Sequence, residues 1–215
     1  MKKVAVILSG CGVYDGAEIH EAVLCLLHLS RHGAGYQCFA PDKLQHHVVN
    51  HLTGEEQAGG RNVLEEAARI ARGQIRPLHE LNAADFDALL LPGGFGAAKN
   101  LCDFASKGAD TRVDPQVLAA CKAFAAARKP AGYCCIAPVL IPHAYPAGVK
   151  GTIGTDAGVA DAFTAMGGEH IGCAVTDVVE DSHYKVISTP AYMLAENIAE
   201  ADTGIGKLVK RLLEM

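Results

Sequence analysis

Two adjacent cysteines stand at the end of a short apolar run, in A-G-Y-C-C-I-A-P-V-L at residues 131–140. Side chains alternate along a strand, so Cys134 is expected to pack within a sheet and Cys135 to lie at the turn that follows. An abrupt strand-to-helix turn is typical of a nucleophile elbow, and the helix N-terminus behind it favours a thiolate. A lowered pKa would make Cys135 nucleophilic and oxidisable. A buried apolar cysteine is the alternative interpretation.

Two further loops could complete a site around this thiol. In P-G-G-F-G at 92–96, glycines allow close backbone approach, and their N–H groups could stabilise an oxyanion together with the N–H of Ile136. The loop S-G-C-G-V-Y-D-G at 9–16 leads to Glu18, at the start of a helix. The helix dipole favours an acidic residue there whatever its role. Held against a thiol in a desolvated cleft, its carboxyl would have a raised pKa and could give and take a proton.

The elements around these loops predict how they come together. Apolar runs predict strands at 4–8, 36–40, 86–91 and 130–134, and a hairpin formed by 174–180 and 184–189. Helical spacing predicts helices at 17–30, 61–72, 115–128 and 192–213, with a loop-dominated insertion at 43–60. Strands that alternate with helices indicate βαβ units, and hence an α/β protein with a mostly parallel sheet covered on both faces. Ligands bind such sheets at the carboxyl ends of the strands, where the three loops converge.

Composition narrows the class of partner. The 215 residues are 50% hydrophobic and 20% charged, with a net charge of -5, which gives no electrostatic reason to expect nucleic acid or an anionic membrane. No apolar run approaches the roughly 20 residues that span a bilayer, so we expect a soluble protein in a reducing, cytoplasmic compartment. Eight scattered cysteines then indicate buried thiols, without a disulfide framework or a metal site.

Taken together, several motifs resemble the ElbB branch of the ThiJ/PfpI superfamily, the isoprenoid-biosynthesis proteins with an amidotransferase-like domain. The similarity runs along the whole chain. It includes L-S-G-C-G-V-Y-D-G at 8–16, E-I-H-E-A-V at 18–23, F-A-P-D at 39–42, N-H-L-T-G-E at 50–55, L-P-G-G-F-G-A-A-K-N at 91–100, C-I-A-P at 135–138, T-I-G-T-D at 152–156 and T-P-A-Y-M-L-A at 189–195.

This resemblance implies a flavodoxin-like three-layer α/β sandwich, class I glutamine amidotransferase-like, with residues 1–215 as one domain and a homodimer as the assembly. It implies a glyoxalase that converts glyoxal to glycolate without glutathione, metal or other cofactor. Cys135 would form a hemithioacetal, and Glu18 would move a proton between the two carbons. The N–H groups of Gly94 and Ile136 would meet the oxyanion.

One departure from the superfamily narrows the chemistry. Many of its hydrolases carry His directly after the cysteine, but position 136 is Ile, and no His in the chain has Glu two residues later. This argues against peptidase and glutaminase activity. Gly12, His51 and His143 are candidate pocket residues, and either histidine could complete the site in space or be a solvated loop residue.

Other functions remain open. G-C-G-V-Y-D-G resembles a dinucleotide fingerprint, but its third glycine is one position late. His46, His47 and His51 could suggest a metal, although the surrounding residues do not predict a helix to align them. Cys135 could instead be the redox sensor of a regulatory protein linked to isoprenoid biosynthesis, because thiolate character governs oxidation as well as nucleophilic attack.

Overall fold

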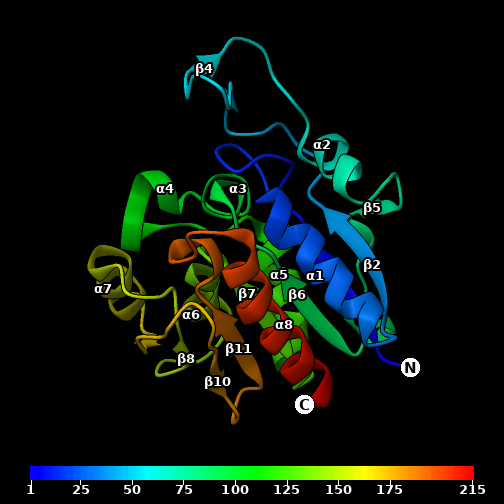
Figure 1. Cartoon of the computed structure of the whole chain (residues 1–215), viewed down its shortest axis with the longest axis vertical. Coiled ribbons are helices and arrows are strands. Elements are labelled where there is room, and N and C mark those ends of the chain that lie inside the picture. The colour runs from blue at the N-terminus through cyan, green and yellow to red at the C-terminus, as the bar shows by residue number, and fades with distance from the viewer.

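A seven-stranded sheet forms the centre of the molecule, which a computed structural model describes for residues 1–215 (Figure 1). The strand order is β10-β11-β7-β6-β1-β2-β5, and every neighbouring pair is parallel except β10 and β11. The strands of this sheet are β1 (Lys3–Ile7), β2 (Gly35–Ala40), β5 (Ile75–Pro77), β6 (Ala88–Leu91), β7 (Ala131–Cys134), β10 (Val179–Asp181) and β11 (Val186–Thr189).

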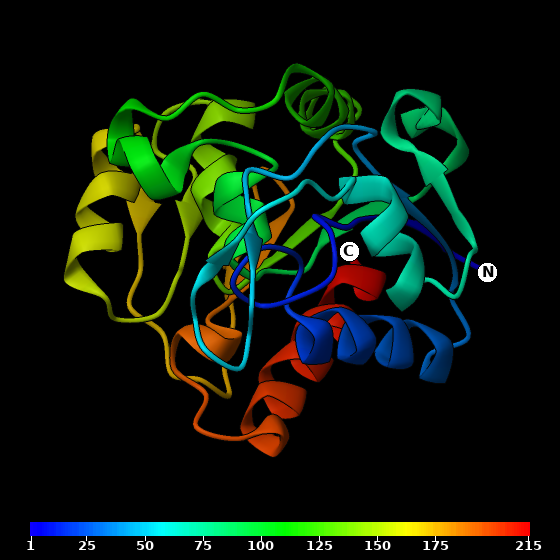
Figure 2. The ribbon, with the colours of Figure 1, turned by 90° about the horizontal axis from the view of Figure 1, so that it is seen from above.

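Helices cover both faces of the sheet. Seen from above, α1 and α8 lie on one face and α5 lies on the other (Figure 2). The helices are α1 (Ile19–Arg31), α2 (Val63–Ile70), α3 (Phe95–Lys99), α4 (Phe104–Lys107), α5 (Pro115–Ala126), α6 (Ile141–Ala144), α7 (Ala157–Ala165) and α8 (Ile198–Glu214). Short 3₁₀ turns occupy Leu78–Glu80, Ala83–Asp85, Gly108–Asp110, Ala137–Leu140 and Ala191–Met193. The predicted three-layer α/β fold with a mostly parallel sheet is confirmed.

The central strands are buried on both sides, which explains their continuous apolar sequences. All four residues of β6 and of β7 are buried, as expected for parallel strands between two helical layers. One cluster of 51 buried residues joins these strands to the inner faces of the helices. None of the helices combines the length and apolar character that crossing a membrane requires.

The C-terminal part of the chain differs from the sequence prediction in its details. The hairpin is confirmed, with β10 and β11 antiparallel, but β10 begins only at Val179. The last helix begins at Ile198, six residues later than expected, because Asn197 caps it by accepting from the N–H groups of Ala199 and Glu200. The helices α3, α4 and α7 and the short strands β5, β8 (Lys150–Gly151) and β9 (Glu169–His170) were not predicted.

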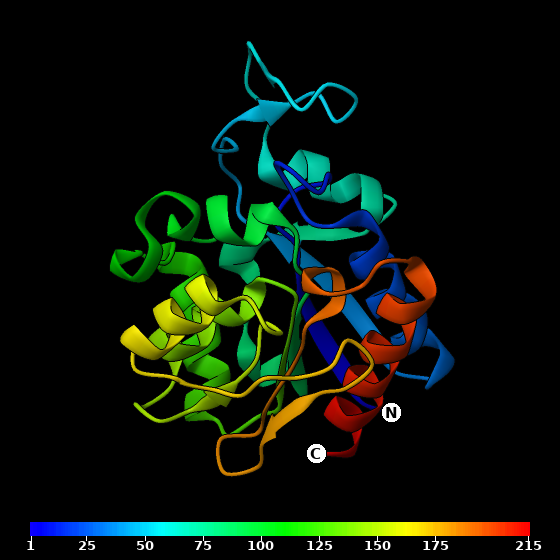
Figure 3. The ribbon, with the colours of Figure 1, turned by 60° about the vertical axis from the view of Figure 1, so that its left-hand side comes forward.

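The predicted insertion is confirmed as an irregular segment that carries a small hairpin. Its strands β3 (Val48–Val49) and β4 (Glu56–Gln57) pair antiparallel, and the segment projects beyond the carboxyl edge of the sheet (Figure 3). Asn62 ends the segment by capping α2. The insertion therefore stands next to the loops that the sequence assigns to the site.

Candidate active site

The elbow is a left-handed turn at the end of β7. Cys135 has a φ of 59°, a conformation that costs a residue with a side chain roughly 1–2 kcal/mol. Its N–H donates to Thr189 O at 2.9 Å, which extends the β7–β11 ladder by one bond and holds the turn. Cys134 is fully buried, with its Sγ 3.9 Å from that of Cys25. The alternation expected from the sequence therefore separates a packing cysteine from one at the turn.

Cys135 lines a cavity of about 410 Å³ at the carboxyl edge of the sheet. Glu18, Gly94 and Ile136 line the same cavity, so the structure brings together these four residues named from the sequence. Ten of the thirteen lining residues are hydrophobic, and none is a histidine. The other nine are Val13, Phe95, Ala98, Lys99, Phe104, Ala105, Val159, Tyr192 and Met193.

The carboxyl group in contact with the thiol belongs to Glu21, which the sequence analysis did not single out. Glu21 is completely buried on α1. Its two oxygens accept from backbone N–H groups, Oε2 from Gly93 at 2.9 Å and Oε1 from Tyr192 at 3.0 Å. It lies close to Cys135 across Gly93, and each of the two groups affects the pKa of the other. The elbow thus has a buried carboxyl partner whose position is fixed from two sides.

Burial raises the pKa of Glu21 from 4.5 to about 7. Burial, followed by the negative charge of Glu21, also raises the pKa of the Cys135 thiol well above its usual value. The N–H groups of Gly94 and Ile136 act in the opposite direction, but they do not outweigh these two effects. The expected lowering of the thiol pKa is therefore wrong, because the elbow is desolvated and faces a carboxylate.

Glu18 lies beside this pair and has a local structural role. Its Oε2 accepts from the N–H of Glu21 at 2.7 Å, so its side chain caps the first turn of α1. It remains a lining residue of the cavity. The two glutamates are thus arranged differently, with Glu18 at the cavity wall and Glu21 against the sulfur.

The glycine loop at 93–94 permits the close approach that places Glu21 and Cys135 together. A Cβ on Gly93 would meet the Cys135 Cβ and lie 2.6 Å from Glu21 Oε2. Gly94 has a φ of 91°, and a Cβ there would collide with the backbone N of Glu18. The elbow, this loop and the start of α1 are therefore in direct backbone contact, which supports the predicted closeness of the three loops.

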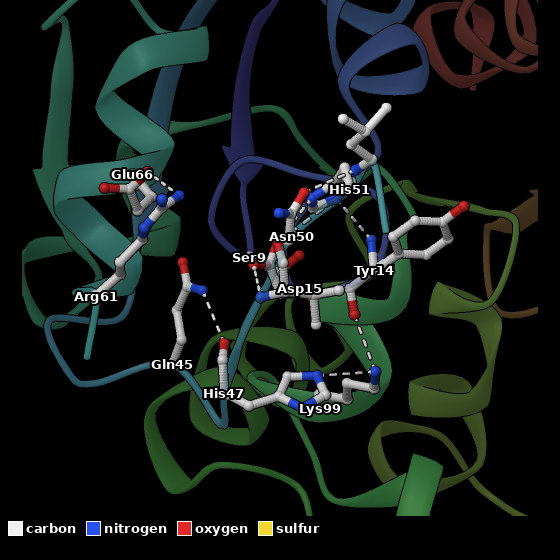
Figure 4. Close-up of polar contacts among 12 residues, drawn as sticks. Ser9, Tyr14, Asp15, Gln45, His47, Asn50, His51, Arg61, Glu66 and Lys99 are labelled. Atoms are coloured by element: carbon white, nitrogen blue, oxygen red, sulfur yellow. Dashed lines mark hydrogen bonds and ion pairs between the residues drawn. The ribbon is translucent and has the colours of Figure 1, made fainter. Parts of the chain in front are cut away.

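Gly12, His51 and His143 are not among the residues that line this cavity. His51 holds the first glycine loop instead (Figure 4): its Nε2 accepts from Tyr14 N at 3.1 Å, and its Nδ1 lies 3.0 Å from Val49 O. Gly12 lies against the ring, because a Cβ there would be 2.8 Å from His51 Cε1. His143 Nε2 lies 3.2 Å from Met166 Sδ. The structure brings neither histidine to the thiol.

The hydrogen bonds around the first glycine loop also include Lys99 and the insertion. Lys99 Nζ donates to Tyr14 O at 2.9 Å and lies 3.0 Å from His47 Nε2 (Figure 4). Nowhere do three or more His, Cys, Asp or Glu side chains gather in a way that could hold a metal ion, and all eight cysteines are free. The contacts of His51 with Tyr14 and of His47 with Lys99 therefore hold the insertion next to the cavity.

A sequence signal for Glu21 does exist. The buried positions Glu21, Cys25 and Leu29 recur every four residues on α1, so Glu21 occupies the inward stripe of an amphipathic helix. A carboxyl group in such a stripe must be protonated or paired with a specific partner. This stripe could have favoured Glu21 over Glu18 as the carboxyl next to the thiol.

This geometry defines the class of protein: an amidotransferase-like α/β sandwich with a cysteine elbow. Drosophila melanogaster DJ-1beta shares the fold, with a TM-score of 0.56, 15% identity, and coverage of 99% of this chain and 94% of that one. A closer likeness is the isoprenoid biosynthesis protein with amidotransferase-like domain from Ehrlichia chaffeensis. Its crystal structure gives a TM-score of 0.94 and 37% identity, and covers 100% of this chain and 99% of that one.

Curated relatives agree with this structural likeness. The rat ES1 protein homolog, mitochondrial, and the human glutamine amidotransferase-like class 1 domain-containing protein 3, mitochondrial, are each 48% identical over 99% of this chain, which covers 84% and 83% of them. No family model matches the sequence. The chain belongs to the family of these ES1 proteins and of the isoprenoid biosynthesis protein with amidotransferase-like domain, and it shares its fold with DJ-1. The expected cytoplasmic location is contradicted, because the rat and human relatives are named as mitochondrial proteins.

Proposed function

We propose that this protein converts glyoxal to glycolate, with Cys135 as nucleophile and Glu21 as the base that activates it. One observation carries the proposal: a left-handed elbow cysteine lines a cavity while its thiol lies against a buried carboxyl whose pKa is about 7. A general base is most effective when its pKa lies near the working pH. Backbone strain at such a residue is also typical of a functional site.

The steps balance without a redox cofactor. The Cys135 sulfur adds to one aldehyde carbon, and the thiol proton passes to the Glu21 carboxylate, which then delivers it to the new oxyanion to give the hemithioacetal. The N–H groups of Gly94 and Ile136 lower the pKa of the Cys135 thiol, which places them near the sulfur. They would therefore lie close to the oxyanion that forms on the adjacent carbon. The hemithioacetal C–H proton then moves to the neighbouring carbon through an enediol, which leaves a glycolyl thioester. Water hydrolyses the thioester to glycolate and restores the thiol.

We assign the carbon-to-carbon proton transfer to Glu18. Glu18 is the one carboxylate that lines the cavity, whereas both Glu21 oxygens accept from backbone N–H groups. Its capping bond to Glu21 N engages Oε2 and leaves Oε1 for the substrate. Asn is also a good N-cap residue, so Glu18→Asn keeps the cap of α1 and removes the carboxyl group that would transfer the proton.

The alternative role as a redox sensor has less support from the geometry. Reaction with peroxide requires thiolate, and burial together with Glu21 raises the pKa of Cys135. Peptidase and glutaminase activity also lack support, since no histidine lines the cavity to serve as the base of a Cys-His pair. We also propose that residues 1–215 form a single domain and that the protein is a homodimer. Light scattering tests the homodimer.

The test is steady-state conversion of glyoxal to glycolate by purified protein, with Cys134→Ala as the matched control. Cys135→Ala is expected to abolish turnover, because no other thiol lines the cavity. Cys134→Ala should retain most of the activity, since its side chain packs against Cys25. Equal loss in the two folded variants would remove the elbow assignment, and wild-type protein without glyoxalase activity would end the proposal.

A further inference from the structure

The proposed reaction uses only a small part of the Cys135 cavity. We propose that the physiological substrate is an uncharged aldehyde or 2-oxoaldehyde that carries an apolar chain of several carbons, and that glyoxal is its smallest analogue. This inference rests on the proposed function, because it assumes that Cys135 attacks an aldehyde carbon. It specifies the shape, polarity and charge of the rest of the substrate.

The volume of the cavity gives the first argument. At the roughly 30 Å³ that a water molecule occupies in the liquid, about 410 Å³ holds about 14 waters. Glyoxal has two carbons and two oxygens, so it would leave most of this space to solvent. A volume of this size lies within the range of small-molecule pockets, roughly 300–1,000 Å³. The cavity therefore fits a larger substrate.

The walls give the second argument. Apart from the reacting end, Lys99 and Tyr192, the lining comes from apolar side chains in segments far from the elbow in sequence. They include Phe95 and Ala98 on α3, Phe104 and Ala105 on α4, Val159 on α7, and Met193 in the 3₁₀ turn Ala191–Met193. Such walls stabilise only a ligand that has apolar surface to bury, and each buried methylene is expected to raise affinity about fourfold.

The charges give the third argument. Glu18 is the acidic group on the wall, and Glu21 lies buried against Cys135. The cation on the wall, Lys99, has its ammonium group engaged by Tyr14 O and His47 Nε2. A carboxylate on the substrate would enter an apolar, desolvated space that already holds acidic groups. An uncharged chain is therefore favoured over an anionic one.

A chain-length series tests the inference with the wild-type protein. We expect kcat/KM to rise from glyoxal through methylglyoxal to butylglyoxal and hexylglyoxal, by about fourfold per methylene until the cavity is full. An alkylglyoxal of the same length that ends in a carboxylate should lose at least tenfold relative to its uncharged counterpart. A flat series, or a preference for the carboxylate, would overturn the inference.

Two substitutions on α7 link the series to the cavity. Val159 lines the cavity and is half-buried, whereas Ala160, the next residue, does not line it. Val159→Phe fills space, so the ratio of kcat/KM for hexylglyoxal to that for glyoxal should fall at least tenfold. Ala160→Phe adds the same ring to the same helix and should leave the ratio unchanged. Equal ratios in the two folded variants would show that the cavity does not select the chain.

A binding measurement separates failure of this inference from failure of the proposed function. Calorimetry of Cys135→Ala with 2-alkanones, from propanone to nonan-2-one, needs no chemistry. Affinity that rises with chain length supports the apolar cavity even if no dicarbonyl is turned over, and absence of turnover then counts against the proposed function alone. Turnover of glyoxal with no chain-length trend in either assay rejects the inference and leaves the proposed function intact.

Discussion

Two cavities of similar size lie at the carboxyl edge of the molecule, and their walls are opposite in character. The one beside the insertion has a volume of about 470 Å³, and only two of its ten lining residues are hydrophobic. The Cys135 cavity, of about 410 Å³, has ten hydrophobic residues among thirteen. Volume therefore does not distinguish a reaction site from a surface hollow in this protein.

The origin of the walls differs as well. All residues of the polar cavity lie between Val48 and Arg61, so one segment folds around it. The Cys135 cavity takes its walls from segments spread between Val13 and Met193. Residues from distant segments enclose the thiol and Glu21 and remove them from water, which raises the pKa of both. Perturbed ionisable groups in an apolar cleft are a better sign of function than size.

The largest expected effect compares the buried carboxyl group behind Cys135 with an exposed carboxyl group of the polar cavity. Glu21→Gln removes the proposed base, so glyoxal turnover should fall roughly 10²–10⁴-fold. Glu56, an exposed wall residue of the polar cavity, is the matched control, and Glu56→Gln should change turnover less than twofold. Steady-state kinetics measure the loss of turnover in both variants. Comparable losses would contradict the assignment of Glu21 as the base.

A pair of glycines tests the packing of the two regions. Gly94 and Gly54 have positive φ values of 91° and 76°, so Ala is strained at both positions. At Gly94 the new methyl also collides with the backbone of residues 16–18, just before α1, whereas at Gly54 nothing lies within 4 Å. We expect Gly94→Ala to cost about 4 kcal/mol of unfolding free energy and Gly54→Ala about 1 kcal/mol. Urea denaturation measures both, and equal costs would contradict the tight contact between the 93–94 loop and residues 16–18.

The raised pKa of Glu21 predicts how stability depends on pH. The folded state holds the Glu21 proton up to about pH 7, whereas an unfolded chain releases it near 4.5. This stabilisation is complete below the unfolded pKa and is lost as pH rises through the folded value. Relative to Glu21→Gln, the wild type should therefore lose about 3 kcal/mol between about pH 4.5 and about pH 8. Denaturation of both proteins across this range measures how the unfolding free energy depends on pH. A difference between the two proteins that stays constant with pH would mean that the pKa of Glu21 is not raised in the folded state.

The smallest effect is in the pH profile of the reaction. Below about pH 7 the Glu21 carboxyl holds its proton and cannot take the one on Cys135. kcat/KM for glyoxal should therefore fall about tenfold for each pH unit below this value. Residual activity of Glu21→Gln should lack this limb. A wild-type profile that is flat between about pH 5 and about pH 8 would exclude Glu21 as the base.

Much of the framework could be predicted from the sequence, because the signals are local. The apolar runs of β1, β6 and β7 predicted buried parallel strands, and alternation across Cys134 and Cys135 predicted which cysteine lies at the turn. The elements that were missed, such as α3 and α4, are helices of five and four residues. They are too short to show a helical period and depend on tertiary contacts.

The sequence by itself determined the mostly parallel central strands, the position of the elbow and the closeness of the three loops, since strand alternation and turn position follow from the order of residues. Only the tertiary structure decided which glutamate contacts the thiol, which way the thiol pKa shifts, and that His51 and His143 stay out of the cavity. These outcomes depend on how α1, the 93–94 loop and residues 191–193 enclose one carboxyl group. Desolvation depends on the complete set of neighbours, which no local stretch of sequence specifies.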